Sequence, residues 1–159
     1  MSKNDRAQVI VLLADGFEEA GVSIILTTLR QAGLAVNLVG LRSRRVSGAH
    51  GLVIVPDTSL DRMLRDSAPI LALILPGGAG YLTRLRVDPR VSTLLKRSIV
   101  EKAILVGLGN HVFQTVTDLV ANNDQSANII QLKAGMYLED FASSLAQRLV
   151  DITETRTGR

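Results

Sequence analysis

The chain contains no cysteine and no tryptophan. The missing cysteines exclude disulfides, thiolate metal sites and thiol nucleophiles. Aromatic residues make up only 3% of the 159 residues, although 47% of the chain is hydrophobic. The core must therefore be built from Leu, Val, Ile and Ala, which suits layers of helices packed on a sheet.

Histidine and long apolar runs are also scarce. The two histidines, His50 and His111, lie far apart and show no metal-ligand spacing, so we predict no metal and no cofactor. No apolar stretch approaches the roughly 18 residues of a membrane span. The segment from Met1 to Arg6 is polar rather than signal-like. We expect a cytoplasmic protein with no membrane partner, forming one domain over residues 1–159.

Charge is close to balanced, with 18 Lys and Arg against 15 Asp and Glu. The basic residues cluster at 42–45, with smaller groups around Arg84 and Arg86 and in the tail. Because no aromatic residues are interleaved with them, this pattern favours solvated loop charges over a nucleic-acid surface. We therefore expect no nucleic-acid partner.

The most informative stretch is the apolar run 70–75, which stops in the glycine-rich turn 76–80. Such a run is typical of a strand buried on both faces of a parallel sheet. Ligands collect beyond the carboxyl ends of such strands, where glycines let backbone N–H groups approach a carbonyl or an anion. Gly77 and Gly78 are therefore candidate ligand-binding residues. A tight strand-to-helix turn without a ligand is the alternative interpretation.

The rest of the chain alternates between predicted strands and helices, which indicates an α/β fold with a mostly parallel sheet. Further strands are predicted at 8–13, 34–40, 52–55, 103–108 and 128–132. Helices are predicted at 18–32, 60–65, 91–101, 111–120 and 137–152. The tail 153–159 has no apolar period and is predicted to fray.

The strand at 103–108 breaks sharply into a helix, which is the geometry of a nucleophile elbow. This elbow presents Leu108, Gly109 or Asn110. His111 follows at the helix N-terminus, where it could act as a base or be a plain surface or capping residue. Glu18, in the first turn of its helix, could point toward the crevice or simply complement the helix dipole.

A second apolar stripe on the first helix consists of Phe17, Ala20 and Ile24. Such a stripe indicates either deeper packing or a dimer surface.

Together these segments resemble the ThiJ/PfpI superfamily from about Val9 to Leu149. The resemblance rests on the order and spacing of ADGFEE at 14–19, VIVPD at 53–57, LPGG at 75–78 and the elbow at 107–116. It implies a flavodoxin-like sandwich with helices on both faces of the sheet. It also implies a homodimer.

Active members of that superfamily use an elbow cysteine, a glutamate in the first helix, an oxyanion hole at the Pro-Gly-Gly turn and often a histidine. Matching the elbow puts Gly109, or Leu108 after a one-residue shift, where the cysteine belongs. Matching the first helix puts Gly21 where the glutamate belongs. The chain between 120 and 128 is too short for the segment that usually supplies the histidine.

The leading hypothesis is therefore a catalytically degenerate member that binds either a small anionic or carbonyl ligand or a partner protein. The ligand would lie at Gly77, Gly78, Gly109 and Asn110. The first alternative is a hydrolase or glyoxalase/deglycase-like enzyme that uses water activated by His111 or Glu18. The second alternative is a chaperone-like structural dimer.

Overall fold

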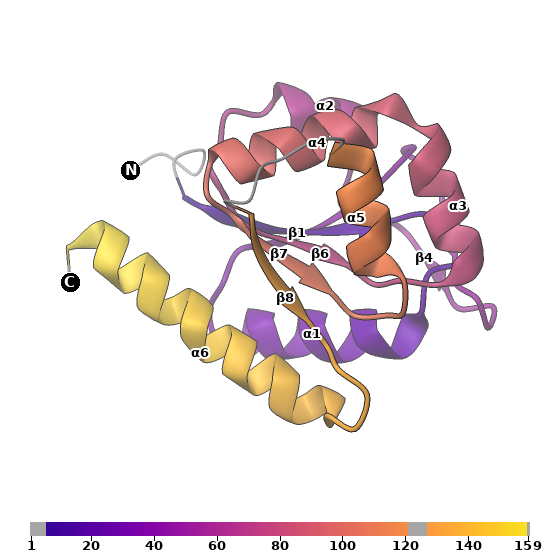
Figure 1. Ribbon diagram of the computed structural model, residues 1–159. Coiled ribbons are helices and arrows are strands. Elements are labelled where there is room, and N and C mark those ends of the chain that lie inside the picture. Colours follow the sequence, from indigo (N-terminus) through magenta and orange to yellow (C-terminus); the bar gives the residue numbers. More distant parts are fainter. Residues whose placement is uncertain (1–5, 121–126, 159) are drawn as a thin grey trace.

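The computed structural model describes residues 6–120 and 127–158 (Figure 1). Within these residues a six-stranded sheet has the order β5-β2-β1-β6-β7-β8, and all its pairings are parallel. The strands are β1 (Gln8–Leu13), β2 (Val36–Gly40), β5 (Thr58–Ser59), β6 (Ile70–Leu75), β7 (Ile104–Gly107) and β8 (Asn128–Gln131). The predicted α/β fold with a mostly parallel sheet is confirmed.

Helices cover both faces of this sheet (Figure 1). One face carries α1 (Glu19–Gln31) and α6 (Leu138–Thr157), which pack against each other. The other face carries α2 (Leu60–Arg65), α3 (Ala79–Val87), α4 (Pro89–Val100) and α5 (Val112–Val120). None of the described helices is both long and apolar enough to cross a membrane.

The core is aliphatic, as the composition predicts. Every residue of β1 and β6 is buried, because helices cover these central strands on both faces. Three aromatic residues join this core: Phe17 and Tyr81, which are fully buried, and Phe141, which is 5% exposed. The Tyr81 hydroxyl donates to the carbonyl oxygen of Leu12 at 2.8 Å, which satisfies the buried hydroxyl group.

The strand that the sequence predicts at 52–55 is shorter than expected and does not join the main sheet. Instead, β4 (Val53–Ile54) pairs antiparallel with β3 (Val46–Ser47) in a separate hairpin, and Val53 is 54% exposed. The position beside β2 is taken by β5. Asp57 accounts for this, because its N–H donates to the Leu38 carbonyl at 2.8 Å and its carboxylate accepts the Leu38 N–H at 2.8 Å. These two bonds fix the chain at the edge of β2 just after the hairpin.

Helix α3 was not predicted, because its two arginines and early glycine hide a short buried face made of Tyr81, Leu82 and Leu85. The prediction of a frayed tail was also wrong for the described residues, since α6 continues to Thr157. Threonine hydroxyls donate to carbonyls one turn earlier, and Gly158 (φ 73°) ends the helix in the left-handed conformation. Residues 121–126, which belong to the short connection that the sequence indicates between 120 and 128, lie outside the described residues.

The turn after β6 brings two stretches of backbone unusually close together. Gly77 and Gly78 have φ angles of 88° and 113°, which favour glycine. A Cβ on Gly78 would lie 2.3 Å from the carbonyl oxygen of Gly16, in the turn after β1. The turns after β1 and β6 therefore touch through backbone atoms.

Replacing Gly78 with Ala should destabilise the protein far more than replacing Gly51 with Ala. Gly51 also has a positive φ (89°), but a Cβ there would meet nothing within 4 Å. Gly51→Ala should therefore cost about 1 kcal/mol of backbone strain, and Gly78→Ala at least about 2 kcal/mol more from the backbone collision. Urea unfolding of both variants measures this difference. Equal losses would contradict the close approach of the two turns.

Candidate functional site

A pocket of about 440 Å³ lies at the carboxyl ends of β6 and β7. We call it the elbow pocket. Its lining residues are Glu18, Gly78, Ala79, Leu82, Leu108, Gly109, Asn110 and His111. Five of them, Glu18, Gly78, Gly109, Asn110 and His111, are candidates that the sequence singles out. Residues up to 93 positions apart along the chain, from Glu18 to His111, thus meet where parallel strands end.

Gly77, in contrast, does not line the pocket. It is buried, and a Cβ on it would lie 2.9 Å from the Cα atom of Gly109. Its carbonyl oxygen accepts the Glu18 N–H at 3.1 Å. Gly77 therefore holds the turns after β1, β6 and β7 together. Of the two glycines, only Gly78 is placed to contact a ligand in the pocket.

The elbow itself is a turn of four residues between β7 and α5. The Leu108 N–H donates to the Leu75 carbonyl at 3.0 Å, so the bonding between β6 and β7 extends one residue past the strand. His111 has a φ of 63°, a left-handed conformation that histidine adopts more readily than most residues. In a nucleophile elbow the reactive residue holds the strained turn. Here the left-handed residue is His111, whose side chain is exposed.

Leu108 and Gly109, the two residues that the sequence left open for the cysteine position, lie in different surroundings. Leu108 is only 9% exposed, and a Cβ on Gly21 would lie 3.1 Å from its Cδ1 atom. Leu108 therefore occupies the space beside Gly21, on α1. Gly109 packs against Gly77 instead.

Two helices begin at the elbow pocket, α3 after Gly78 and α5 after His111. Within the described residues, the backbone N–H groups of Gly78, Gly109 and Asn110 donate no hydrogen bond. Unpaired donors and the positive ends of two helix dipoles suit a carbonyl or carboxylate oxygen. The pocket can therefore hold an oxygen that carries negative charge.

A sequence model of the DJ-1/PfpI family matches residues 7–144. The chain belongs to the DJ-1/PfpI family. Among curated proteins it is 30% identical to the Parkinson disease protein 7 homolog of Danio rerio over 102 residues, 64% of this chain and 53% of that protein. It is also 31% identical to a deglycase of Thermococcus kodakarensis over 71 residues, 45% of this chain and 42% of that protein.

Solved structures of DJ-1 proteins share the fold. A DJ-1 superfamily protein from Salmonella typhimurium superposes with a TM-score of 0.75 at 24% identity, covering 91% of each chain. Drosophila melanogaster DJ-1beta also gives 0.75, at 22% identity, covering 96% of this chain and 97% of its own. The matched region spans about half of the curated relatives' length.

The predicted dimer stripe does not form one surface in this DJ-1/PfpI chain. Phe17 is fully buried, so deeper packing is the correct interpretation for that residue. Ala20 is exposed and Ile24 is half-buried. The homodimer stays a prediction.

A second cluster lies beside the elbow pocket, and the sequence did not reveal it. Glu18, Glu19 and His50 each place one ligand atom within 4.8 Å of the others, which is close enough to hold a metal ion. The linear spacing hides this group, because the hairpin brings His50 back to α1. Glu19 is committed to other contacts, however. Its carboxylate accepts the backbone N–H groups of His50 and Leu52 at 2.9 to 3.1 Å and contacts His50 Nδ1 at 3.0 Å.

Glu19 therefore acts as the anchor of the β3–β4 hairpin. Gly48 leaves the space for it, since a Cβ there would lie 2.4 Å from the Glu19 side chain. Partial removal from water raises the pKa of Glu19, but the hydrogen bonds from Leu52 and His50 outweigh this and lower that pKa below 4.5. The hydrogen bond from Glu19, its charge and that of Glu18 raise the pKa of His50 above 6.5.

These two pKa shifts define a pH range in which both Glu19 and His50 contribute to the stability of the fold. The contribution of Glu19 to stability is present above pH 4.5 and is lost as the pH falls through its lowered pKa. The contribution of His50 is complete below pH 6.5 and is lost as the pH rises through its raised pKa. Both contributions are present between those values.

Glu19→Gln should lower the pKa of His50, because it removes both the charge and the strongest hydrogen-bond acceptor. Glu18→Gln is the matched control, since Glu18 acts on His50 through charge alone and should lower that pKa by less. Titration of the His50 ring protons by NMR measures both effects. Equal decreases in the two variants would contradict the anchoring contact.

Proposed function

We propose that this DJ-1/PfpI protein binds a small carbonyl or carboxylate compound in the elbow pocket and does not perform thiol chemistry. The observation that carries the proposal is the packing of Leu108 beside Gly21. The resemblance to the ThiJ/PfpI superfamily places Gly21 where a glutamate belongs. In one of the two registers that it leaves open, it places Leu108 where a cysteine belongs, and in the other it places Gly109 there. A hydrocarbon side chain beside a glycine can neither attack a carbonyl nor hold a proton.

The remaining parts of the pocket support binding. The unpaired N–H groups at Gly78, Gly109 and Asn110 would donate to an oxygen of the ligand, and the two helix N-termini would favour its negative charge. Such an arrangement stabilises an oxyanion in enzymes that also have a nucleophile. Without a nucleophile it would hold a ground-state carbonyl or carboxylate.

A second candidate is an enzyme that activates water. The presence of Glu18 and His111 on the same pocket supports it, since a carboxylate and an imidazole can share general acid and base roles. One relative of this chain is named a deglycase, which also favours an enzymatic function. The binding proposal is preferred because the hydrocarbon side chain of Leu108 fills the space beside Gly21 at the elbow, where a nucleophile would have to lie.

The purified protein should bind pyruvate in the elbow pocket and should not convert methylglyoxal at enzyme-like rates. Pyruvate binding is measured from amide shifts at Gly78 and Asn110 by NMR. Asn110→Asp places a carboxylate on the pocket and should weaken pyruvate binding at least about fivefold through like-charge repulsion. Thr117→Asp, on an exposed part of α5 outside the lining, is the control and should leave binding unchanged.

Methylglyoxal turnover that disappears in His111→Ala or Glu18→Gln would contradict the proposal and support the water-activating enzyme. Equal weakening of pyruvate binding in Asn110→Asp and Thr117→Asp would show that pyruvate does not bind in the elbow pocket.

The contact between Leu108 and Gly21 is tested by a double-mutant cycle on stability. Gly21→Glu alone should destabilise the fold, because its side chain would collide with Leu108. Leu108→Cys should relieve that collision, so the two changes together should cost about 1 kcal/mol less than their sum. Urea unfolding of the two single variants and the double variant measures the coupling. If the losses of unfolding free energy in the two single variants simply added up in the double variant, Leu108 would not occupy the space beside Gly21.

The predicted homodimer, the chaperone-like alternative and the cytoplasmic location stay predictions. Sedimentation of the wild-type protein and of Ala20→Arg would test the homodimer. If the exposed Ala20 lies in the dimer interface, a charge at this position should dissociate the dimer.

A further inference from the structure

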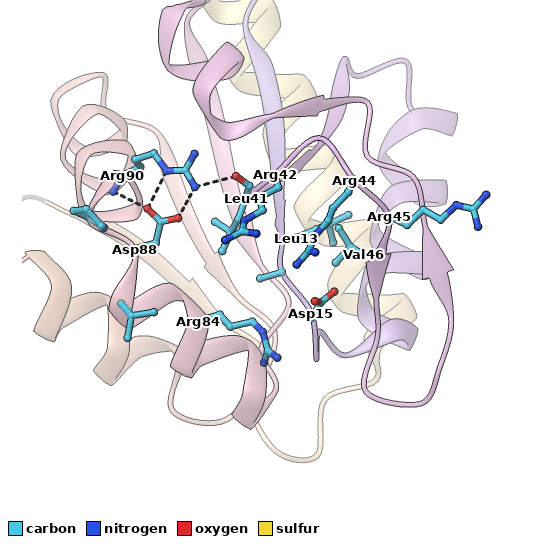
Figure 2. Close-up of a pocket in the computed structure, with 13 residues that line it drawn as sticks. Leu13, Asp15, Leu41, Arg42, Arg44, Arg45, Val46, Arg84, Asp88 and Arg90 are labelled. Atoms are coloured by element: carbon cyan, nitrogen blue, oxygen red, sulfur yellow. Dashed lines mark hydrogen bonds and ion pairs between the residues drawn. The ribbon is translucent and has the colours of Figure 1, made fainter.

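A second pocket, of about 330 Å³, lies beyond the carboxyl ends of β1 and β2 (Figure 2). We call it the arginine pocket. Five arginines and two aspartates line it, a local excess of three positive charges, and it shares no lining residue with the elbow pocket. The arginines come from the segment after β2 and from the region where α3 passes into α4. The fold thus brings together basic residues that are about 40 positions apart.

One of these arginines is already neutralised. Arg90 donates to both carboxylate oxygens of Asp88 at 2.6 and 3.0 Å, to Asp61 at 2.9 Å and to the Leu41 carbonyl at 2.9 Å. The dashed lines in Figure 2 show its bonds within the pocket wall. Arg90 and Asp88 therefore form a fixed wall, in which the one guanidinium group of Arg90 is already satisfied by the carboxylates of Asp88 and Asp61.

Three other arginines are not paired in this way. Arg42, Arg44 and Arg84 make no ion pair within the described residues. All three point into the pocket, whereas the neighbouring Arg45 points away from it (Figure 2). Asp15, whose carboxylate accepts the Ser47 N–H at 2.9 Å, lies among them. Arg42 also interacts through charge with Asp88, which Arg90 already pairs. The three guanidinium groups therefore exceed the negative charge that is available to balance them.

Converging guanidinium groups repel each other unless an anion lies between them. Guanidinium groups match phosphate oxygens with paired hydrogen bonds, and a phosphate dianion can serve several at once. The rest of the lining is mostly apolar, with Leu13, Ala14, Val46 and Pro89 among its residues. The volume lies in the range of small-molecule sites. The pocket thus combines a charged region with an apolar one.

We propose that the arginine pocket binds a phosphate monoester of a small organic molecule. Arg42, Arg44 and Arg84 would hold the phosphate, and the organic group would lie against the apolar residues near Leu13. This site is separate from the elbow pocket, so its occupancy does not depend on the function proposed there.

The test uses phenyl phosphate as the probe, with phenol and inorganic phosphate for comparison. Phenyl phosphate should shift the NMR signals of residues 13–15 and 41–46 but not those of Gly78 and Asn110. Inorganic phosphate should shift the same signals and bind more weakly, and phenol should not shift them. Arg44→Gln and Arg84→Gln should each weaken phenyl phosphate binding at least about tenfold.

Arg45→Gln is the matched control, because it removes the same charge from the neighbouring residue, whose guanidinium group points away from the pocket (Figure 2). It should change affinity by less than about twofold. Asp15→Asn keeps an acceptor for Ser47 while removing the opposing charge, so it should tighten binding. Equal losses in the Arg44 and Arg45 variants would overturn the proposal in favour of diffuse attraction to a basic surface. Inorganic phosphate binding as tightly as phenyl phosphate, or no shifts with phenyl phosphate, would also overturn it.

Discussion

The structure depends on backbone-to-backbone packing between three turns that follow parallel strands. Gly78 lies against the Gly16 carbonyl, and Gly77 lies against Gly109. Because no side chain separates these turns, the ends of β1, β6 and β7 converge closely. This convergence sets the position of α3, which starts at the turn and carries residues of both pockets. Ala79 and Leu82 line the elbow pocket, and Arg84 lines the arginine pocket.

The sequence predicts the central layers well because their signals are local. The apolar runs of β1, β6 and β7 are continuous, and α2 begins and ends where the serine cap and the apolar spacing indicate. Helix α3 escaped prediction because its buried residues are few. The hairpin at 46–54 escaped because apolar residues such as Val53 resemble a buried strand, while the bonds of Asp57 that exclude it from the sheet depend on tertiary structure.

In the candidate site too, the residues with local sequence signals could be predicted and those that depend on tertiary structure could not. The glycine turn and the elbow each have a recognisable local pattern, so Gly78, Gly109, Asn110 and His111 could be named from the sequence. The Glu19 anchor and the arginine pocket have no linear signature. In the sequence, the basic segment 42–45 is indistinguishable from solvated loop charge. Only the fold places it opposite Arg84 and Asp88.

In this member of the DJ-1/PfpI family, Leu108 packs beside Gly21 of α1 at the elbow. The turns after β1, β6 and β7 bring the N-termini of α3 and α5 to the elbow pocket. Within the described residues, this arrangement leaves the backbone N–H groups of Gly78, Gly109 and Asn110 without an acceptor.

The hydrogen-bonded Tyr81 has a spectroscopic consequence. The chain has no tryptophan and two tyrosines, of which Tyr137 is 76% exposed and Tyr81 is fully buried. The near-ultraviolet circular dichroism of the native protein should therefore contain a tyrosine band dominated by Tyr81. Since Tyr81 lies on α3, which carries residues of both pockets, that band offers an intrinsic optical reporter of movement in this helix.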